Sequence, residues 1–284
     1  MSTFLRALTA SLLMILAVSS FCQSPSDELN TLLMHSTFKI YGPDATKPEN
    51  TSFGTVFFIG MPIKGDDQNA SAVLVTAAHV LDGIGGDIAT LLLRRKPKDG
   101  PYVPFPYTFK IRTNGSPLYV KHESADVAVM YMALPSGKLP ISVLTPNYLA
   151  DDKRIEELEI HPGDEVFCLG FPLSAHGPGG FPFLRAGRLA SYPITPAKDV
   201  REWDFDALIH DGNSGGPVYF YYENRRYGKA MHFGFQRGVL GLVTKKINSA
   251  IPDFKDKPLN YGVIVPAQFI RETLDKLPPE SPYK

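Results

Sequence analysis

Short apolar runs bounded by glycine, proline or asparagine recur along most of this chain, and they constrain its fold more than any other feature. Runs of this length and spacing are typical of β-strands in sandwiches and barrels. They cover residues 37–40, 54–59, 72–76, 89–94, 108–112, 127–132, 165–169, 183–191, 218–222, 239–244 and 261–265. A polar link at residues 151–159 divides the runs into two series. The chain is therefore predicted to be all-β, with two antiparallel six-stranded β-barrels at about 36–135 and about 160–266.

Residues 267–277 have a different pattern. Phe269, Ile270, Leu274 and Leu277 follow a helical period, so we expect a C-terminal α-helix that packs on the second barrel.

The first 22 residues form a separate unit. Arg6 precedes an apolar stretch, 7–18, that is too short to span a bilayer comfortably, and small residues follow at 18–20. This pattern predicts a signal peptide at 1–22 and an exported domain at 23–284, periplasmic or secreted, with no integral membrane span after cleavage. Cys22 leaves lipoprotein anchoring open, although Phe21 before it fits such processing poorly.

Bulk composition gives no sign of a strongly charged partner. Hydrophobic residues make up 44% of the chain, and 29 basic residues balance 29 acidic ones, so neither nucleic acid nor an anionic membrane is implied. Five of the seven histidines show no metal-ligand spacing, and no metal or cofactor is predicted. These five are His35, His122, His161, His176 and His232.

The most informative local motif is Asp-Gly-Asn-Ser-Gly-Gly-Pro at residues 211–217, just before an apolar run. It places the hydroxyl of Ser214 on a tight turn. Gly212 can adopt backbone angles that a side chain would forbid. The N–H groups of Gly212 and Ser214 could then form an oxyanion hole for an acyl-transfer intermediate.

A base and an acid precede this serine. His79 follows an apolar strand and the small residues Ala77 and Ala78, which would let the backbone pack closely and leave the imidazole open. Asp126 stands at the start of the run 127–132, where its carboxylate could fix the tautomer of His79. Taken singly, His79 could be a buried structural histidine and Asp126 a turn residue. Together with Ser214 they predict a catalytic triad.

The chain order His79, Asp126, Ser214 is that of the chymotrypsin-like arrangement. Residues 76–80 (Thr-Ala-Ala-His-Val), 126–129 (Asp-Val-Ala-Val) and 212–217 (Gly-Asn-Ser-Gly-Gly-Pro) resemble the three motifs of the trypsin-like serine peptidases. The disulfide-poor bacterial branch that includes the HtrA-type proteases is the most similar. Further stretches resemble strands of the same family: 53–59, 163–172, 238–244 and 261–266.

This resemblance implies a serine endopeptidase that acts on polypeptides, with its site in the cleft between the two barrels. It also implies no downstream PDZ domain, because no residues remain for one. Cys168 would have no partner after removal of the leader with Cys22, and the absence of a disulfide favours a bacterial exported enzyme. Cys168 itself is expected in the core.

Substrate preference is predicted from residues around the serine. By the resemblance, Leu208 lies at the base of the primary pocket, and Ile209 and Val243 line its walls. None of them offers a carboxylate to a basic side chain, so cleavage after small or medium apolar residues is expected. Lys246 at the pocket rim and His210 nearby keep an acidic preference open.

Two other functions remain as alternatives. Gly-x-Ser-x-Gly also occurs in α/β-hydrolases, but these need an acid and then a histidine after the serine, and only His232 follows. The second alternative is a catalytically silent protease fold that serves as a binding module.

Overall fold

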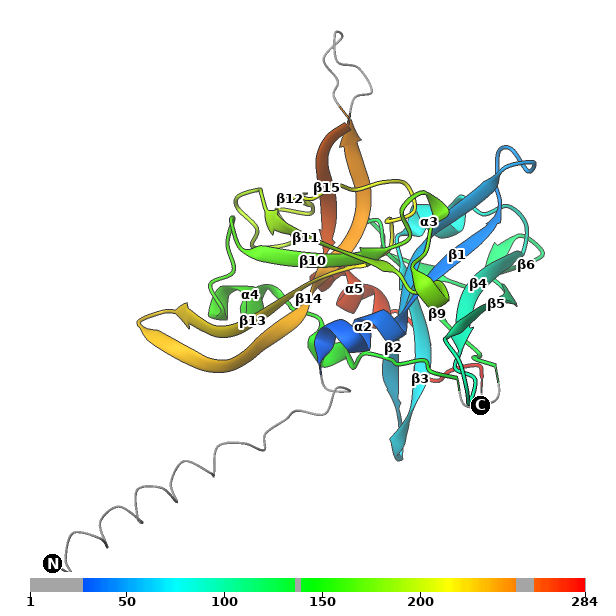
Figure 1. Cartoon of the computed structure of the whole chain (residues 1–284), viewed down its shortest axis with the longest axis horizontal. Coiled ribbons are helices and arrows are strands. Elements are labelled where there is room, and N and C mark those ends of the chain that lie inside the picture. Colours follow the sequence, from blue (N-terminus) through cyan, green and yellow to red (C-terminus); the bar gives the residue numbers. More distant parts are fainter. Residues whose placement is uncertain (1–27, 136–138, 249–257, 284) are drawn as a thin grey trace, which may run out of the picture.

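The protein is described by a computed structural model covering residues 28–135, 139–248 and 258–283, in which two β-rich units lie side by side (Figure 1). The predicted signal peptide, including Cys22, lies outside these residues. None of the described helices has the length and apolar content needed to cross a membrane.

The first unit is one antiparallel sheet of seven strands in the order β5-β4-β1-β2-β3-β9-β8. The strands are β1 (Thr37–Pro43), β2 (Thr51–Ile63), β3 (Asp66–Thr76), β4 (Ile88–Arg95), β5 (Val103–Lys110), β8 (Val120–Lys121) and β9 (Ala128–Tyr131). A separate two-stranded sheet joins β6 (Arg112–Thr113) to β7 (Ser116–Pro117). Six strands had been predicted here. The extra one, β8, has only two residues, which is too short to give an apolar pattern.

The second unit is a closed barrel in the order β10-β11-β12-β15-β14-β13. Its strands are β10 (Glu165–Gly170), β11 (Phe183–Leu189), β12 (Trp203–Asp206), β13 (Pro217–Tyr227), β14 (Ala230–Asn248) and β15 (Pro258–Pro266). Every pair of neighbouring strands is antiparallel. The all-β prediction is confirmed, and the two antiparallel units are consistent with a chymotrypsin-like double barrel, although only the second is a closed barrel. The α/β-hydrolase alternative is wrong because that fold needs a parallel sheet.

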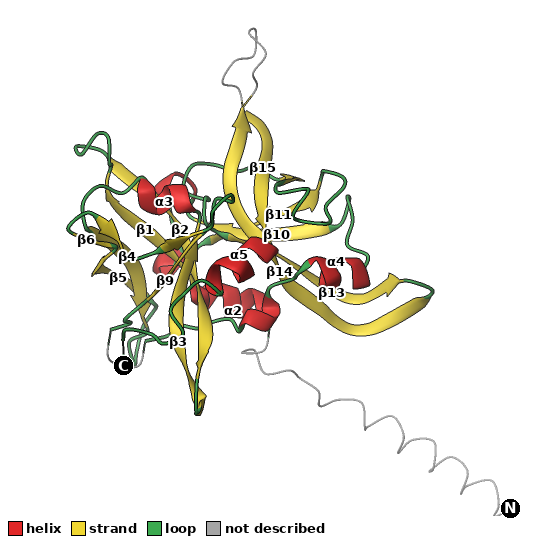
Figure 2. Cartoon of the chain, turned by 180° about the vertical axis from the view of Figure 1, so that it is seen from behind, coloured by secondary structure: helices red, strands yellow, loops and turns green. Residues whose placement is uncertain are grey.

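Short helices surround and connect the two units (Figure 2). They are α2 (Leu29–Ser36), α3 (Ala78–Asp82), α4 (Asp152–Glu157) and α5 (Ala267–Leu274), with 3-10 turns η2 (Pro146–Tyr148), η3 (Pro172–Ser174) and η4 (Pro178–Gly180). The polar link contains α4. The Asp151 carboxylate caps the N-terminus of this helix by accepting a hydrogen bond from Arg154 N at 2.9 Å.

The predicted C-terminal helix is α5, and it ends at Leu274, earlier than expected. Packing on the second barrel had been predicted. The buried residues Phe269, Ile270 and Leu274 instead belong to the hydrophobic cluster that residues of the first unit mainly form. His122, which precedes β9, donates from Nε2 to Glu272 Oε2 at 3.0 Å, because its Nδ1 already accepts from the backbone N–H groups of Ser124 and Ala125. The helix therefore bridges both units.

The strands β13 and β14 continue beyond the barrel as a long hairpin that extends away from the body, coloured yellow to orange in Figure 1. The ladder runs from Pro217↔Leu242 to Tyr227↔Ala230. Only the barrel part, at 218–222 and 239–244, was predicted. Polar residues and a register shift between Glu223 and Arg225 interrupt the apolar pattern of the outer part.

Candidate active site

Pairing of β3 with β9 brings the predicted base and acid together. Thr76 at the end of β3 lies opposite Ala128 in β9, so the residues that follow one strand meet those that precede the other. His79 Nδ1 lies 2.6 Å from Asp126 Oδ2, and His79 N donates to Asp126 Oδ1 at 3.0 Å. One carboxylate thus fixes both the ring and the backbone of His79.

The second unit contributes a third contact to this acid. Thr244 in β14 donates its Oγ1 hydroxyl to Asp126 Oδ2 through a short hydrogen bond. Burial alone would raise the pKa of Asp126, but the hydrogen bonds from His79 and Thr244 and the charge of His79 outweigh it and hold the pKa below the ordinary value. Asp126 therefore stays ionised beside the imidazole.

The predicted nucleophile lies on a turn between β12 and β13. Gly212 and Gly215 have φ of 95° and 85°, and a Cβ at either position would overlap backbone oxygen, of Phe171 and of Thr55 respectively. These positions therefore require glycine.

Strand β2 of the first unit holds this turn in place. Thr55 Oγ1 donates to Gly212 O at 2.6 Å, and Thr55 N donates to Ser214 O at 2.8 Å. The carbonyl oxygens of Gly212 and Ser214 are thus both hydrogen-bonded. Their N–H groups, in contrast, have no acceptor within the described part of the chain. They are the donors that an oxyanion would need.

The hydroxyl of Ser214 donates to the carbonyl oxygen of Thr244 at 3.1 Å. No hydrogen bond joins Ser214 to His79 among the residues that the structure describes. Catalytic hydrogen bonds in free enzymes are often loose and tighten only with substrate.

Thr244 is the site residue that sequence reasoning missed. Its hydroxyl contacts the acid and its carbonyl contacts the nucleophile, so one residue of β14 joins both. A threonine inside a strand is ordinary, and only its place at the end of the apolar run 239–244 could have drawn notice.

The predicted pocket residues differ in how deeply they are buried. Ile209 and Val243 are buried in the second barrel core, whereas Leu208 is 43% exposed. His210 is half-buried, and its carbonyl accepts from Asn213 N at 3.1 Å. Lys246 pairs through its backbone with Gly262 of β15.

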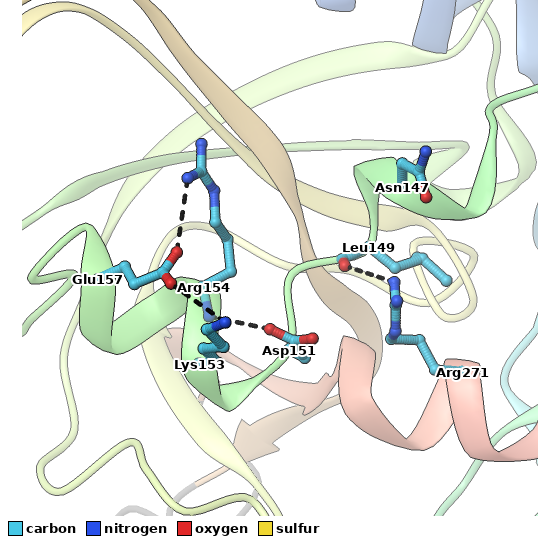
Figure 3. Close-up of a pocket in the computed structure, with 7 residues that line it drawn as sticks. All are labelled: Asn147, Leu149, Asp151, Lys153, Arg154, Glu157 and Arg271. Carbon is cyan, nitrogen blue, oxygen red and sulfur yellow. Dashed lines mark hydrogen bonds and ion pairs between the residues drawn. The ribbon is translucent and has the colours of Figure 1, made fainter.

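None of the predicted pocket residues lines either of two hollows in the described structure. One, of about 290 Å³, is lined by Asp126 with Ser124, Ala125, Arg201, Glu202 and Val265. The other, of about 320 Å³, lies between the link, α4 and α5, and none of the three predicted triad residues lines it (Figure 3). There Arg271 donates to Leu149 O at 3.0 Å, which ties α5 to the link.

Cys168 takes the core position that the sequence predicts. Cys168 is fully buried, and this burial raises the pKa of its thiol to about 12, so it is an inert core residue. Among the described residues, no group of three or more His, Cys, Asp or Glu side chains is placed to hold a metal ion.

Similar structures occur among the solved proteins. A crystal structure of the Rv3671c protease from M. tuberculosis, in its active form, aligns with 92% of this chain and 90% of that one, at a TM-score of 0.47 and 19% sequence identity. No protein-family model and no curated protein matches the sequence. A function for this chain must therefore be inferred from its own residues.

Proposed function

We propose that this protein is a serine endopeptidase whose catalytic residues are Ser214, His79 and Asp126. One observation carries the proposal: Asp126 holds His79 at two atoms, and Thr244 links that same carboxylate to the hydroxyl of Ser214. The three residue types, their chain order and the contacts between His79 and Asp126 match the division of roles in nucleophilic acyl transfer.

The proposed reaction uses each contact. With Nδ1–H directed at Asp126, neutral His79 has its lone pair on Nε2 and can take the proton of Ser214. The serine oxygen attacks the peptide carbonyl, and the N–H groups of Gly212 and Ser214 stabilise the oxyanion. His79 then gives the proton to the leaving amine, and water repeats the sequence to release the acid.

Labelling with a fluorophosphonate tests the proposal directly, because the reagent forms a stable bond only with an activated serine. We expect one modified residue, Ser214, identified by mass spectrometry of the digested protein. Ser214→Ala and His79→Ala should abolish labelling, and Ser281→Ala, which is remote from the triad, should not. A folded wild-type protein that stays unlabelled would instead support the silent binding module.

Substrate preference is part of the proposal. Ile209 and Val243 are buried and apolar, and neither offers a carboxylate to a basic side chain. We expect cleavage after small or medium apolar residues, measured with matched chromogenic peptides that end in Val, Leu, Glu and Arg. A preference for Arg would overturn this assignment, and a preference for Glu would point to Lys246 and His210.

Export and the HtrA-type relationship are proposals that depend on the sequence alone. The leader at 1–22 supports export to the periplasm or medium. Anchoring as a lipoprotein through Cys22 is the alternative form of export. The amino-terminal sequence of the protein recovered from outside the cytoplasm tests this. A start after residue 20 supports cleavage, and retention of Met1 contradicts it.

A further inference from the structure

The outer part of the β13–β14 hairpin exposes three large apolar side chains. Phe233 is 82% exposed, Met231 is 50% exposed and Phe235 is 36% exposed. Met231 lies opposite Arg226 and Phe235 opposite Glu223 in the ladder, and a register shift separates the two pairs. Exposed apolar side chains gathered in this way mark a surface that contacts a partner or a membrane. Met231, Phe233 and Phe235, with Arg226, are called the hairpin face below.

The opposite side of the hairpin is already occupied. Arg225 donates to Asp164 Oδ2 and to Glu159 O, each at 2.7 Å, and its guanidinium lies 4.5 Å from the ring of Tyr222. The ring centroids of Tyr227 and His232 are 3.5 Å apart. These contacts fix the hairpin against the barrel and leave the hairpin face directed to solvent.

Cationic side chains surround the hairpin face. Between Glu223 and Arg237 the sequence has four Lys or Arg residues and one acidic residue. Arg226 lies directly opposite Met231, and both it and Lys229 at the tip are exposed, with no ion-pair partner in the described part of the chain. The protein has a formal net charge of zero, but its β13–β14 hairpin is locally basic.

The base of the hairpin adds a basic hollow to this surface. Asn147, Tyr148, Arg154, Phe235 and Arg237 line a space of about 240 Å³. Arg154 reaches the hairpin by donating to Gln236 Oε1 at 3.1 Å, and Figure 3 shows it extending from α4 away from Arg271. A phosphate group would find two guanidinium groups and an amide there.

The N-terminal end of the described chain lies beside the same hairpin. Tyr219 of β13 donates its hydroxyl to Asn30 Oδ1 at 2.7 Å, at the start of α2. The first described residues of the chain therefore lie at the base of the hairpin.

We propose that the hairpin face docks on an anionic lipid surface. Met231, Phe233 and Phe235 enter the interfacial region of the bilayer, and Arg226, Lys229 and Arg237 bind the acidic headgroups. Two strands leave the outer backbone groups of the hairpin unpaired, which confines insertion to the hydrated headgroup layer. The protein is thus held at the membrane surface without a spanning segment. This inference does not depend on the proposed peptidase activity.

Fluorescence offers a direct test, because the single tryptophan, Trp203, is fully buried. In Phe233→Trp, the new indole should shift its emission to the blue when vesicles of phosphatidylcholine with one quarter phosphatidylglycerol are added. Tyr192→Trp, at a position 85% exposed on another loop, is the control and should show no shift. No shift in Phe233→Trp would overturn the proposal.

Sedimentation with the same vesicles measures affinity. We expect Met231→Ser with Phe233→Ser, and separately Arg226→Glu with Lys229→Glu, each to weaken binding at least about tenfold. Lys64→Glu with Lys98→Glu reverses two exposed charges elsewhere and should leave binding unchanged. Salt at about 0.5 M should weaken wild-type binding by screening.

Three results would contradict docking on lipid. They are equal binding to pure phosphatidylcholine, equal loss in the Lys64 and Lys98 control, and a concentration-dependent dimer that the Met231 and Phe233 substitutions disrupt. The last would show that a second copy of the chain covers the hairpin face. Hydrolysis of a soluble peptide, measured in parallel, should be unaffected by every hairpin substitution.

Discussion

The two ends of the β13–β14 ladder differ sharply although the same two strands form both. At the inner end Pro217–Phe220 and residues 238–244 are buried, and Thr244 lies between the acid and the nucleophile. At the outer end Arg226, Met231 and Phe233 are exposed. Packing against the barrel core fixes the inner end, whereas only the contacts of one face hold the outer end. Substitutions should therefore affect catalysis and stability at one end and surface binding at the other.

The largest expected difference between the two ends is in turnover. Ser214→Ala or His79→Ala should lower kcat/KM for a peptide substrate by about four to six orders of magnitude, and the double variant should lose little more, because the residues act as a unit. Phe233→Ser should change kcat/KM less than twofold. Near-normal activity in His79→Ala would refute the triad, and a large loss in Phe233→Ser would refute the separation of the two ends.

Glycine positions give the next comparison, in stability. Gly215 and Gly234 both have positive φ, 85° and 96°, but a Cβ at Gly215 would overlap Thr55 O, whereas Gly234 has open space around it. We expect Gly215→Ala to lower the free energy of unfolding by about 3 kcal/mol or more, and Gly234→Ala by about 1–2 kcal/mol from backbone strain alone. Urea denaturation measures both. Equal losses would mean that the turn relaxes around the added methyl group.

The same difference explains what the sequence could predict. Glycine spacing and apolar runs indicated the barrel strands and the serine turn, because local turn chemistry and burial determine them. The apposition of His79 with Asp126 was expected instead from the chain order of the three residues and the family resemblance. The outer hairpin was missed, since its exposed Phe233 and Met231 follow no burial pattern. Strand β12 was missed because Trp203–Asp206 is too short to show a period. The role of Thr244 depends on tertiary contacts across 118 positions of sequence, which no local pattern reveals.

A smaller effect is expected from the hydroxyl of Thr244. Thr244→Val removes the donor to Asp126 but keeps the carbonyl that accepts from Ser214, whereas Thr244→Ser keeps both. Loss of one hydrogen bond to a charged group corresponds to about tenfold in rate. We expect kcat to fall about tenfold in Thr244→Val and to recover in Thr244→Ser, with KM little changed. Unchanged kcat in Thr244→Val would show that His79 alone positions Asp126.

The smallest expected effect is on the pH dependence of stability, and it concerns Asp126. Its pKa in the folded protein is lowered, against the opposing effect of burial, by hydrogen bonds from His79 and Thr244, so its contribution to stability is present above the pKa of an unfolded aspartate, about 3.9. That contribution is lost as the pH falls through the lower folded value.

Urea midpoints recorded from pH 6 down to pH 2.5 should therefore decline less steeply for Asp126→Asn than for the wild type. Asp44→Asn serves as the control outside the ladder: the pKa of Asp44 is also lowered, mainly by the hydroxyl and backbone N–H of Thr46, but this carboxylate lies in the turn between β1 and β2 and is solvent-exposed. Solvent screening should make its effect on the slope smaller than that of Asp126. Parallel curves for Asp126→Asn and the wild type would show that the inner end of the ladder gains no stability from its ionised acid, and that its fixed geometry comes from packing and the glycine turn alone.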